Sequence, residues 1–313
     1  MTPRILLTGA GGQIGSELAL ALAQRYGRDA VIISDIREGA NPGGLHYEQL
    51  DVMDAARLAE LLEKYGITQI YHLAATLSAV GEQKPQFAWT LNMGGLLNVL
   101  ESAVAHGVKR VFWPSSIGAF GPSTPVENTP QGTIMEPQTI YGISKLAGEG
   151  WCRWYFLKKG LDVRSVRYPG LISYKAPPGG GTTDYAVDIF HSAVAGKPYR
   201  CFLKPQTSLP MMYMPDAVAA TIALMEADSN RLTVRDSYNL AAISFTPEQI
   251  AAEIARHIPG FQVEYAPDYR QQIADSWPDS IDDSTARKDW GWQPAYDLAA
   301  MTRDMLENLR MAT

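Results

Sequence analysis

A cluster of glycines directly after a short apolar run near the N-terminus constrains the fold more than any other feature. Residues 5–7 are apolar, Gly9, Gly12 and Gly15 follow at intervals of three, and a helical pattern extends over residues 13–26. A strand, a glycine turn and a helix in this order are typical of a phosphate-binding βα turn, because glycines let the backbone turn tightly and approach a pyrophosphate. The N-terminus of the helix then offers free N–H groups and a positive dipole to the anion. Since a glycine pattern alone also fits a simple turn, the rest of the chain decides between the two interpretations.

Composition narrows the classes of protein to which the chain can belong. It has 313 residues, of which 46% are hydrophobic and 19% charged, as is ordinary for a globular enzyme with one large domain or two unequal ones. A net charge of −6 without a basic stripe argues against nucleic acid or an anionic membrane as a partner. We find no signal-peptide pattern and no apolar stretch long enough to cross a bilayer, and therefore expect a cytoplasmic protein. Cys152 and Cys201 show no metal-ligand spacing, so we expect buried free thiols and no metal site.

Strand and helix patterns alternate along the first 170 residues. Apolar runs, which suit parallel strands buried on both faces, predict further strands at residues 30–35, 46–52, 69–75, 110–114 and 161–168. Helical patterns lie between them at residues 54–65, 87–105 and 139–159, where Asp54 and Thr139 are caps and Gly160 ends the last helix. The six βα repeats predict an α/β fold with a doubly wound parallel (Rossmann) sheet, whose ligands bind at the carboxyl ends of the strands.

The alternation changes from about residue 174 onward. A loop rich in proline and glycine spans residues 176–181, and mixed short helices and strands follow it. We therefore expect a dinucleotide-binding domain at residues 1–173. Residues 174–313 are expected to form mainly a smaller C-terminal substrate-binding lobe, with some segments returning to the main sheet. The apolar run at residues 211–214 predicts a buried strand.

An acidic residue at the end of the second predicted strand bears on the choice of cofactor. Asp35 follows the last glycine of the turn by twenty residues. Such an acid accepts hydrogen bonds from the adenosine ribose and repels a 2′-phosphate, so it favours NAD over NADP, although an aspartate there also simply opens a loop. Arg37 weakens the preference, because an arginine can accept a 2′-phosphate. Asp51 is the corresponding acid after the third strand, where an adenine ring would rest.

Tyr141 and Lys145 lie four residues apart in a predicted helix, so their side chains share one face. A tyrosine hydroxyl has an ordinary pKa of about 10, but a neighbouring ammonium and a cationic nicotinamide both stabilise the phenolate and make it a usable base. Ser116 lies just past the fifth predicted strand, at the edge where the cofactor is expected, and its hydroxyl suits a substrate alcohol or carbonyl. Taken singly, these residues also fit a surface pair and a turn cap.

The glycine turn, Asp35, the serines after the fifth strand and the Tyr-x-x-x-Lys pair occur in the order typical of the extended short-chain dehydrogenase/reductase family. The chain resembles this family over nearly its whole length. The resemblance implies an oxidoreductase that uses NAD, with Ser116, Tyr141 and Lys145 as catalytic residues. Ser115 competes for the serine role, because a one-residue difference in the loop would exchange the two. The cofactor-binding residues that the resemblance implies are Gly9, Gly12, Gln13, Ile14, Gly15, Asp35, Arg37, Asp51, Val52, Leu73, Ala74, Ala75, Tyr141, Lys145 and Leu171.

Five segments resemble the branch of this family that oxidises L-threonine with NAD, namely residues 114–122, 167–173, 179–186, 209–216 and 277–283. The resemblance implies oxidation of the β-hydroxyl of L-threonine to 2-amino-3-ketobutyrate, with Tyr141 as the general base. Ser116 stands where some relatives carry threonine, and either hydroxyl suits the role. The substrate-binding residues that it implies are Ser78, Ser115, Ser116, Tyr141, Thr182, Thr183, Asp184 and Trp277.

The segment 179–184 weakly favours an amino-acid substrate on physical grounds as well. A flexible loop there leads into a helical pattern, and a helix N-terminus with threonine hydroxyls suits a carboxylate. Asp184 would balance an ammonium, although an aspartate in a first turn is ordinarily a dipole partner. Ser78 equally fits a plain loop serine, and Trp277 equally fits a packing aromatic.

Two alternative functions stay open at the level of sequence. A nucleotide-sugar epimerase or dehydratase shares the cofactor half but needs basic residues for a second diphosphate, and the segment 174–230 holds only Lys175, Lys197, Arg200 and Lys204. A non-catalytic dinucleotide-sensing regulator would keep the fold and lose the chemistry, which the intact serine, tyrosine and lysine disfavour.

The resemblance also implies a homodimer formed by the helices at residues 87–105 and 139–159. The second helix is apolar almost all round, with Trp151, Trp154, Tyr155 and Phe156. Burial against both the sheet and a partner would explain this pattern, and burial within the chain alone is the alternative.

Overall fold

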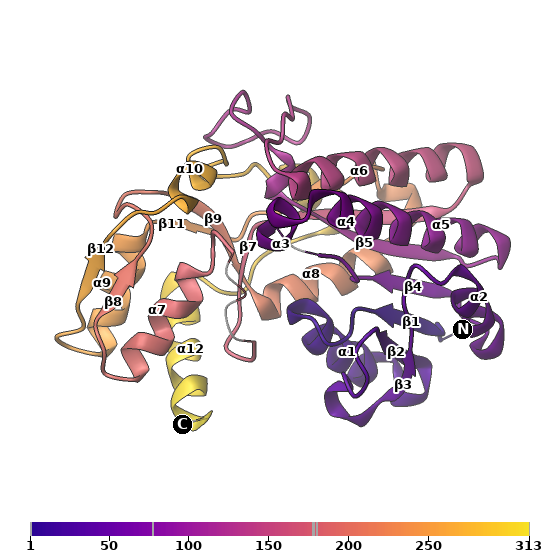
Figure 1. Cartoon of the computed structure of the whole chain (residues 1–313), viewed down its shortest axis with the longest axis horizontal. Coiled ribbons are helices and arrows are strands. Elements are labelled where there is room, and N and C mark those ends of the chain that lie inside the picture. The colour runs from indigo at the N-terminus through magenta and orange to yellow at the C-terminus, as the bar shows by residue number, and fades with distance from the viewer. Residues whose placement is uncertain (1, 77, 177–178, 180, 313) are drawn as a thin grey trace. The chain divides into compact units, whose positions relative to one another are not determined.

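The computed structural model describes residues 2–76, 78–176, 179 and 181–312, and the chain in it divides into two compact units (Figure 1). The first unit comprises residues 1–119, 138–167 and 218–238. The second unit comprises residues 120–137, 168–217 and 239–313. Which ligand each unit binds stays a prediction. No helix among the described residues has both the length and the apolar character needed to cross a membrane.

The first unit is built from alternating strands and helices. Its elements are β1 (Ile5–Thr8), α1 (Gln13–Tyr26), β2 (Val31–Asp35), β3 (His46–Gln49), α2 (Ala55–Tyr65), β4 (Gln69–His72), α3 (Ser78–Gln83), α4 (Pro85–Trp89), a π-helical turn (Thr90–Gly94), α5 (Gly95–Ala105), β5 (Arg110–Ser116), α6 (Ile140–Lys159) and β6 (Asp162–Tyr168). Most of helix α8 (Met214–Glu226), from Val218 onward, and Tyr238 of strand β10 (Tyr238–Asn239) join it from later in the chain.

The main sheet has seven strands in the order β10-β6-β5-β4-β1-β2-β3, which confirms the predicted parallel, doubly wound α/β fold. The chain proceeds from β1 outward to β3 on one side and then returns to β4 on the other side. The strand order therefore reverses beside β1, and in such sheets ligands bind at this point, outside the carboxyl ends of the strands.

Both faces of this sheet are covered by helices. One core cluster combines Leu6, Ile32 and Ile70 of the strands with apolar side chains of α2, α5 and α6. Neighbouring strand residues such as Leu7 and Ile33 are fully buried and point to the opposite face, because side chains alternate along a strand. The layer of α5 and α6 over the sheet can be followed in Figure 1.

The caps of α6 confirm the boundaries predicted for the helix that carries the Tyr-x-x-x-Lys pair. Thr139 accepts a hydrogen bond from the backbone N–H of Gly142, and Gly160 ends the helix in the left-handed conformation with φ 70°. Thr139 satisfies one of the unpaired donors of the first turn, and glycine takes a positive φ without steric cost. The predicted cap of α2 at Asp54 is confirmed in the same way, by a bond from Arg57.

Several expectations from the sequence differ from the structure. β3 ends at Gln49 and β4 at His72, before the predicted ends at residues 52 and 75. The predicted helix 87–105 is interrupted by the π-helical turn, and α3 lies in a segment predicted as a loop. By contrast, Ser116 is the last residue of β5 and so lies at the carboxyl edge of the sheet, as expected.

The second unit holds its own core. Its elements are β7 (Gly170–Ile172), α7 (Tyr185–Val194), β8 (Tyr199–Cys201), β9 (Leu209–Tyr213), β11 (Ile243–Phe245), α9 (Pro247–His257), β12 (Val263–Tyr265), α10 (Arg270–Ala274), α11 (Ser284–Trp290) and α12 (Leu298–Ala312). The three-stranded sheet β11-β9-β7 packs with α7, α9 and α12. β9 is buried throughout, which confirms the strand predicted from its apolar run. Cys152 and Cys201 are buried free cysteines, as expected.

Candidate active site

The glycine turn after β1 permits very close approaches between backbones. Gly9 has φ 75°, and a Cβ on it would lie 2.7 Å from the backbone nitrogen of Ala74. A Cβ on Gly15 would lie 2.2 Å from the carbonyl oxygen of Gly9. Both distances are below van der Waals contact, so β1, the turn and α1 pack as they do only because these residues are glycines. Gly12 caps α1 without a side chain, so no side-chain cap blocks the helix N-terminus.

A pocket opens beside this turn within the first unit. Nine of the predicted cofactor-binding residues line it: Gly9, Gly12, Asp35, Arg37, Asp51, Val52, Leu73, Ala74 and Ala75. Three further lining residues, Ile36, Leu50 and Leu91, were missed. Ile36 and Leu50 lie directly beside predicted residues, whereas Leu91 lies in the π-helical turn and carries no sequence signal. A glycine-lined wall at a helix N-terminus, an acid at the end of β2 and apolar walls fit a dinucleotide.

Other predicted cofactor-binding residues do not line this pocket. Gln13, Ile14 and Gly15 form the first turn of α1 beside it. Tyr141 and Lys145 lie in α6 of the same unit, whereas Leu171 lies in β7 of the second unit.

Asp35 holds Arg37 in a fixed position at the mouth of this pocket. The carboxylate accepts bonds of 3.0 Å from Nε of Arg37 and 2.9 Å from the backbone N–H of Gly11. Burial would raise the pKa of Asp35, but these bonds outweigh it and the net direction is downward. The carboxylate is therefore charged at neutral pH, and the guanidinium that would attract a 2′-phosphate is paired with it. The geometry strengthens the preference for NAD that Asp35 alone indicated.

The ends of β1 and β4 are joined beneath the turn. Thr8 Oγ1 is hydrogen-bonded to Nδ1 of His72 at 2.8 Å, and both side chains are buried. Burial lowers the pKa of His72 to about 3. The imidazole is therefore neutral and acts as a hydrogen-bonding partner at this edge of the sheet.

Ser116, Tyr141 and Lys145 come together at the carboxyl edge of the sheet. A Cβ on Gly118 would lie 3.3 Å from the Tyr141 ring and 3.5 Å from Ser116 Oγ, so the glycine leaves room for both. Burial raises the pKa of Tyr141 to about 12, and a hydrogen bond with Ser116 acts in the opposite direction. The ammonium of Lys145 lies 5.3 Å from the centre of the Tyr141 ring.

Lys145 is fixed by its neighbours on β5. Its Nζ donates to the carbonyl oxygen of Pro114 at 2.6 Å and lies 4.5 Å from the centre of the Trp113 ring. Burial lowers the pKa of Lys145 to about 8. A lysine with such a pKa is still mostly protonated at pH 7, where its charge favours a nearby phenolate.

The structure separates the two neighbouring serines. Ser115 is buried and donates to Glu149 Oε1 at 2.6 Å, whereas Ser116 Oγ accepts from the backbone N–H of Gly118 at 3.1 Å. Ser116 favours the phenolate of Tyr141 and so lowers its pKa, against the effect of burial. Of the two hydroxyls, that of Ser116 lies with the Tyr141 ring around Gly118, whereas that of Ser115 is engaged by Glu149.

Asn92 in the π-helical turn supports the backbone of Tyr141 through Ser144, and this role was not predicted. Its amide accepts from Thr76 N at 2.9 Å and donates to Ser144 Oγ at 3.3 Å. Ser144 in turn donates to the carbonyl oxygen of Tyr141 at 2.7 Å. The extra residue of a π-turn redirects side chains, and here it aims a buried amide at α6.

The predicted substrate-binding residues fall in both units. Ser78 is the first residue of α3, and its side chain lies outside the described part. In the second unit, Thr182, Thr183 and Asp184 form the turn that precedes α7, and Asp184 Oδ2 accepts from Gly181 N at 2.8 Å. Trp277 is half-buried and packs against the core of the second unit.

Comparisons with known proteins identify the family of the chain. The sequence model of the NAD dependent epimerase/dehydratase family matches residues 5–241. An uncharacterized epimerase/dehydratase of Staphylococcus haemolyticus is 52% identical over 308 residues, which are 97% of this chain and 96% of the relative. The structure of a GalE-like L-threonine dehydrogenase from Cupriavidus necator, in its holo form, is 65% identical with a TM-score of 0.97 over 98% of this chain and all of that one.

A further solved structure bears on assembly. A monomeric L-threonine 3-dehydrogenase from a metagenome, in its apo form, is 48% identical with a TM-score of 0.95, and the match covers 98% of this chain and 99% of that one. The family model covers most of the chain, and the whole length of the chain is matched at high identity. This chain therefore belongs to the NAD-dependent epimerase/dehydratase family, the extended short-chain dehydrogenases/reductases, and its cofactor is NAD.

Proposed function

We propose that this protein is an L-threonine 3-dehydrogenase that oxidises the β-hydroxyl of L-threonine to 2-amino-3-ketobutyrate. The observation that carries the proposal is the set of Ser116, Tyr141 and Lys145 at the carboxyl edge of a sheet with a dinucleotide pocket. The high identity to structures of L-threonine dehydrogenases supports the substrate.

The reaction removes a proton and a hydride from the substrate. Bound NAD supplies the nicotinamide ring that accepts the hydride from the β-carbon. Ser116 hydrogen-bonds the β-hydroxyl, and the phenolate of Tyr141 takes its proton, so a ketone forms as the C–H bond breaks. Proton transfer of this kind contributes about 10²–10⁴ to the rate.

Lys145 makes Tyr141 usable as a base. Burial raises the pKa of the phenol to about 12, which is too high for a base at neutral pH. The ammonium of Lys145, and the cationic nicotinamide when it is bound, both favour the phenolate. Lys145 is also proposed to hold the nicotinamide ribose.

The remaining site assignments are proposals as well. Thr182, Thr183 and Asp184 are proposed to bind the carboxylate and ammonium of the amino acid, because hydroxyls and a carboxylate suit the two charges of a zwitterion. Ser78, Trp277 and Leu171 keep their predicted roles, and a cytoplasmic location stays a prediction.

A nucleotide-sugar epimerase or dehydratase is the second candidate, because the matching family model and the staphylococcal relative are both named epimerase/dehydratase. Two of the basic residues that could bind a second diphosphate have acidic partners, which argues against this candidate. Arg200 faces Glu264 at 3.8 Å, and Lys204 faces Asp275 at 3.8 Å. Acidic neighbours of this kind compete with a diphosphate for the cation.

A homodimer through α5 and α6 is proposed. Trp151, Trp154 and Leu157 on α6 are between 38% and 61% exposed, and Trp151 and Trp154 line a groove with Leu97 of α5. Large apolar side chains gathered on one surface mark an interface more often than free surface. The monomeric relative shows that the oligomeric state has to be measured.

The experiment that tests the function follows NADH absorbance with a panel of substrates. L-Threonine, L-allo-threonine, L-serine, UDP-glucose and a GDP-sugar are each supplied with NAD and with NADP. The proposal predicts NADH formation with L-threonine and a preference for NAD. The nucleotide sugars are also followed by chromatography, because an epimerase or dehydratase returns the hydride to its product and accumulates no NADH. Conversion of a nucleotide sugar without oxidation of L-threonine would establish the second candidate instead.

A further inference from the structure

A buried ion pair lies one helical turn beyond Lys145. Glu149 on α6 and Arg167 on β6 have side chains that are each 3% exposed. Arg167 donates to the two carboxylate oxygens through Nε at 3.0 Å and Nη2 at 2.8 Å, and Ser115 adds a third bond at 2.6 Å. The carboxylate therefore ties α6 to both β5 and β6, next to the residues that carry the chemistry.

Stability alone does not explain such a pair. Removing two charges from water costs several kcal/mol, and apolar residues of similar volume often serve a fold equally well. The role of this buried ion pair is therefore sought in the residues that surround it.

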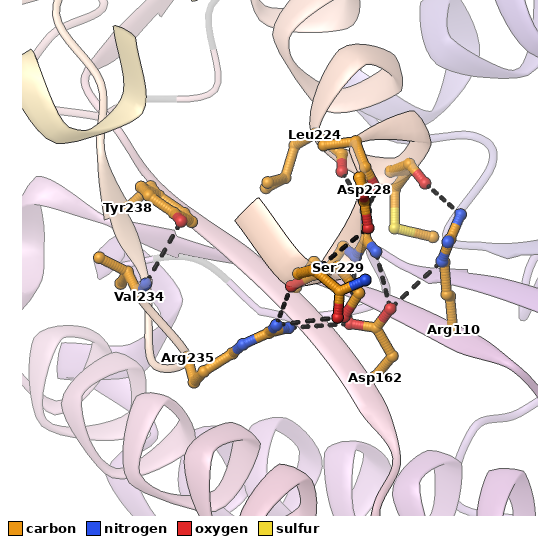
Figure 2. Close-up of polar contacts among 12 residues, drawn as sticks. Arg110, Asp162, Leu224, Asp228, Ser229, Val234, Arg235 and Tyr238 are labelled. Carbon is orange, nitrogen blue, oxygen red and sulfur yellow. Dashed lines mark hydrogen bonds and ion pairs between the residues drawn. The ribbon is translucent and has the colours of Figure 1, made fainter. Parts of the chain in front are cut away.

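A second cluster of ion pairs on β6 has a structural role and serves for comparison. At the start of β6, Asp162 accepts from Arg110, Arg164 and Arg235 (Figure 2). Arg164 also donates to the carbonyl oxygens of Leu224 and Ala227 at the end of α8. This cluster lies at the amino ends of β5 and β6, where it satisfies the last carbonyls of a helix.

The bonds described for the Glu149–Arg167 pair lead to Ser115 on β5 and not to a helix end. Its direct neighbour Ser115 lies between Pro114 and Ser116. The carbonyl oxygen of Pro114 accepts a hydrogen bond from Nζ of Lys145, and Ser116 acts on the hydroxyl of Tyr141. Glu149 is thereby linked, through Ser115, to the two neighbouring β5 residues that contact Lys145 and lie beside Tyr141.

We propose that Glu149 and Arg167 form a positioning pair that, through the bond of Glu149 to Ser115 on β5, holds Lys145 against Tyr141. The catalytic part of this proposal rests on the function proposed above. The part that concerns Lys145 does not depend on the substrate, because it starts from the bonds of Glu149 to Ser115 and of Lys145 to the adjacent Pro114.

The charged surroundings of Lys145 single out Glu149. Burial lowers the pKa of Lys145, and Cys152 and Glu149 act against this. Burial raises the pKa of Cys152, so its thiol is neutral, and His72 on β4 is neutral as well. Tyr141 is the remaining titratable side chain of α6 beside Lys145. Arg167 on β6 faces Glu149 directly, and Asp236 faces the pair. Burial raises the pKa of Glu149 itself, while Arg167 and Ser115 favour its charged form. In that form, Glu149 is the carboxylate that favours the ammonium of Lys145.

Glu149→Gln removes the negative charge and leaves Arg167 positive. Lys145 then loses its proton at lower pH, and at neutral pH the phenolate of Tyr141 loses its support. The double variant Glu149→Gln/Arg167→Gln leaves no unpaired buried charge, and so it is the variant expected to fold best. In the double variant neither the carboxylate nor the guanidinium acts on Lys145, so its midpoint is expected to lie between those of the single variant and the wild type.

The test is a titration of the full-length protein labelled with [ε-¹³C]lysine, followed by NMR. The signal of Lys145 is assigned from its loss in Lys145→Arg. The expected midpoint falls by about one pH unit or more in Glu149→Gln and by less in the double variant. Asp162→Asn, which breaks the pair at the other end of β6, serves as the matched control. It is expected to lower the melting temperature and leave the midpoint of Lys145 unchanged.

Kinetics supply the second readout. The value of kcat with L-threonine at pH 7 is expected to fall about tenfold or more in Glu149→Gln, with little change in KM for NAD. Unchanged midpoints and kcat in both Glu149 variants, with only a lower melting temperature, would overturn the proposal. If the wild type does not oxidise L-threonine but the midpoint shifts as expected, the proposed function fails while the effect of the pair on Lys145 stands.

Discussion

Ser115 donates its hydroxyl proton to Glu149 at 2.6 Å and is thereby turned away from the substrate chemistry, although it directly precedes the serine that bonds Tyr141. Adjacent residues of a strand point to opposite sides, so the two hydroxyls serve different partners. The sequence left the choice between Ser115 and Ser116 open. The partners of the two side chains now distinguish them.

The first prediction compares the two serines. Ser116→Ala removes the hydroxyl beside Tyr141, and kcat with L-threonine is expected to fall about tenfold to a hundredfold. Ser115→Ala leaves Glu149 with its two bonds from Arg167, so its kcat is expected to fall by less than about fivefold, with a loss of about 1–2 kcal/mol in stability. Steady-state kinetics and urea unfolding of both variants check this. An equal or larger loss of kcat in Ser115→Ala would reverse the assignment.

The second prediction concerns the glycine turn. Gly15→Ala would place its Cβ 2.2 Å from the carbonyl oxygen of Gly9, so the turn has to shift and the affinity for NAD is expected to fall about tenfold or more. Gly150→Ala in α6 is the matched control, because a Cβ there meets nothing within 4 Å. Isothermal titration of NAD into both variants measures the effect. Equal affinities would show that close packing at Gly15 does not shape the pocket.

The third prediction is a dependence of stability on pH that arises from His72. Burial lowers its pKa from 6.5 to about 3, so below pH 6.5 the unfolded chain binds a proton that the folded chain does not. The contribution of His72 to stability is therefore complete above pH 6.5 and is lost as the pH falls towards 3, by about 1.4 kcal/mol per pH unit.

His72→Asn keeps a hydrogen-bonding partner for Thr8 and removes this titration. Its melting temperature is expected to change less than that of the wild type between pH 7.5 and pH 5. The same substitution at the partly exposed His257 serves as the control. Parallel curves for the wild type and His72→Asn would contradict the buried, neutral state of His72.

The fourth prediction addresses assembly. Trp154→Glu places a charge on the apolar face of α6, and it is expected to convert a dimer of 34.3 kDa chains into monomers. Leu20→Glu on α1 is the matched control, because Leu20 is 39% exposed and Trp154 is 40% exposed. Sedimentation velocity distinguishes the species. A wild type that sediments only as a monomer would remove the proposed homodimer.

Local signals predicted the parts of the fold that depend on short stretches of chain. The apolar runs that became β1 and β2, and the caps Thr139 and Gly160 of α6, act within a few residues, so the sequence displays them directly. Tyr141 and Lys145 share a face for the same reason.

Features that arise from tertiary contacts were not predictable in this way. The π-helical turn coincides with the bonds of Asn92 to Thr76 and Ser144, and Ser144 is 52 residues away in the chain. Glu149 and Arg167 meet only because α6 packs on β6, so neither residue carries a signal of its own in the sequence. The short helix α3 has no periodic pattern, and a segment of that length reads as a loop.

The most direct test of the account is the rate of NADH formation from L-threonine by the wild type and by Tyr141→Phe, measured together with the affinity of both for NAD. The account predicts that kcat falls by about 10²-fold or more in Tyr141→Phe, because the base is lost, while the affinity for NAD stays within about threefold. Turnover close to that of the wild type in Tyr141→Phe would contradict the central role of this tyrosine.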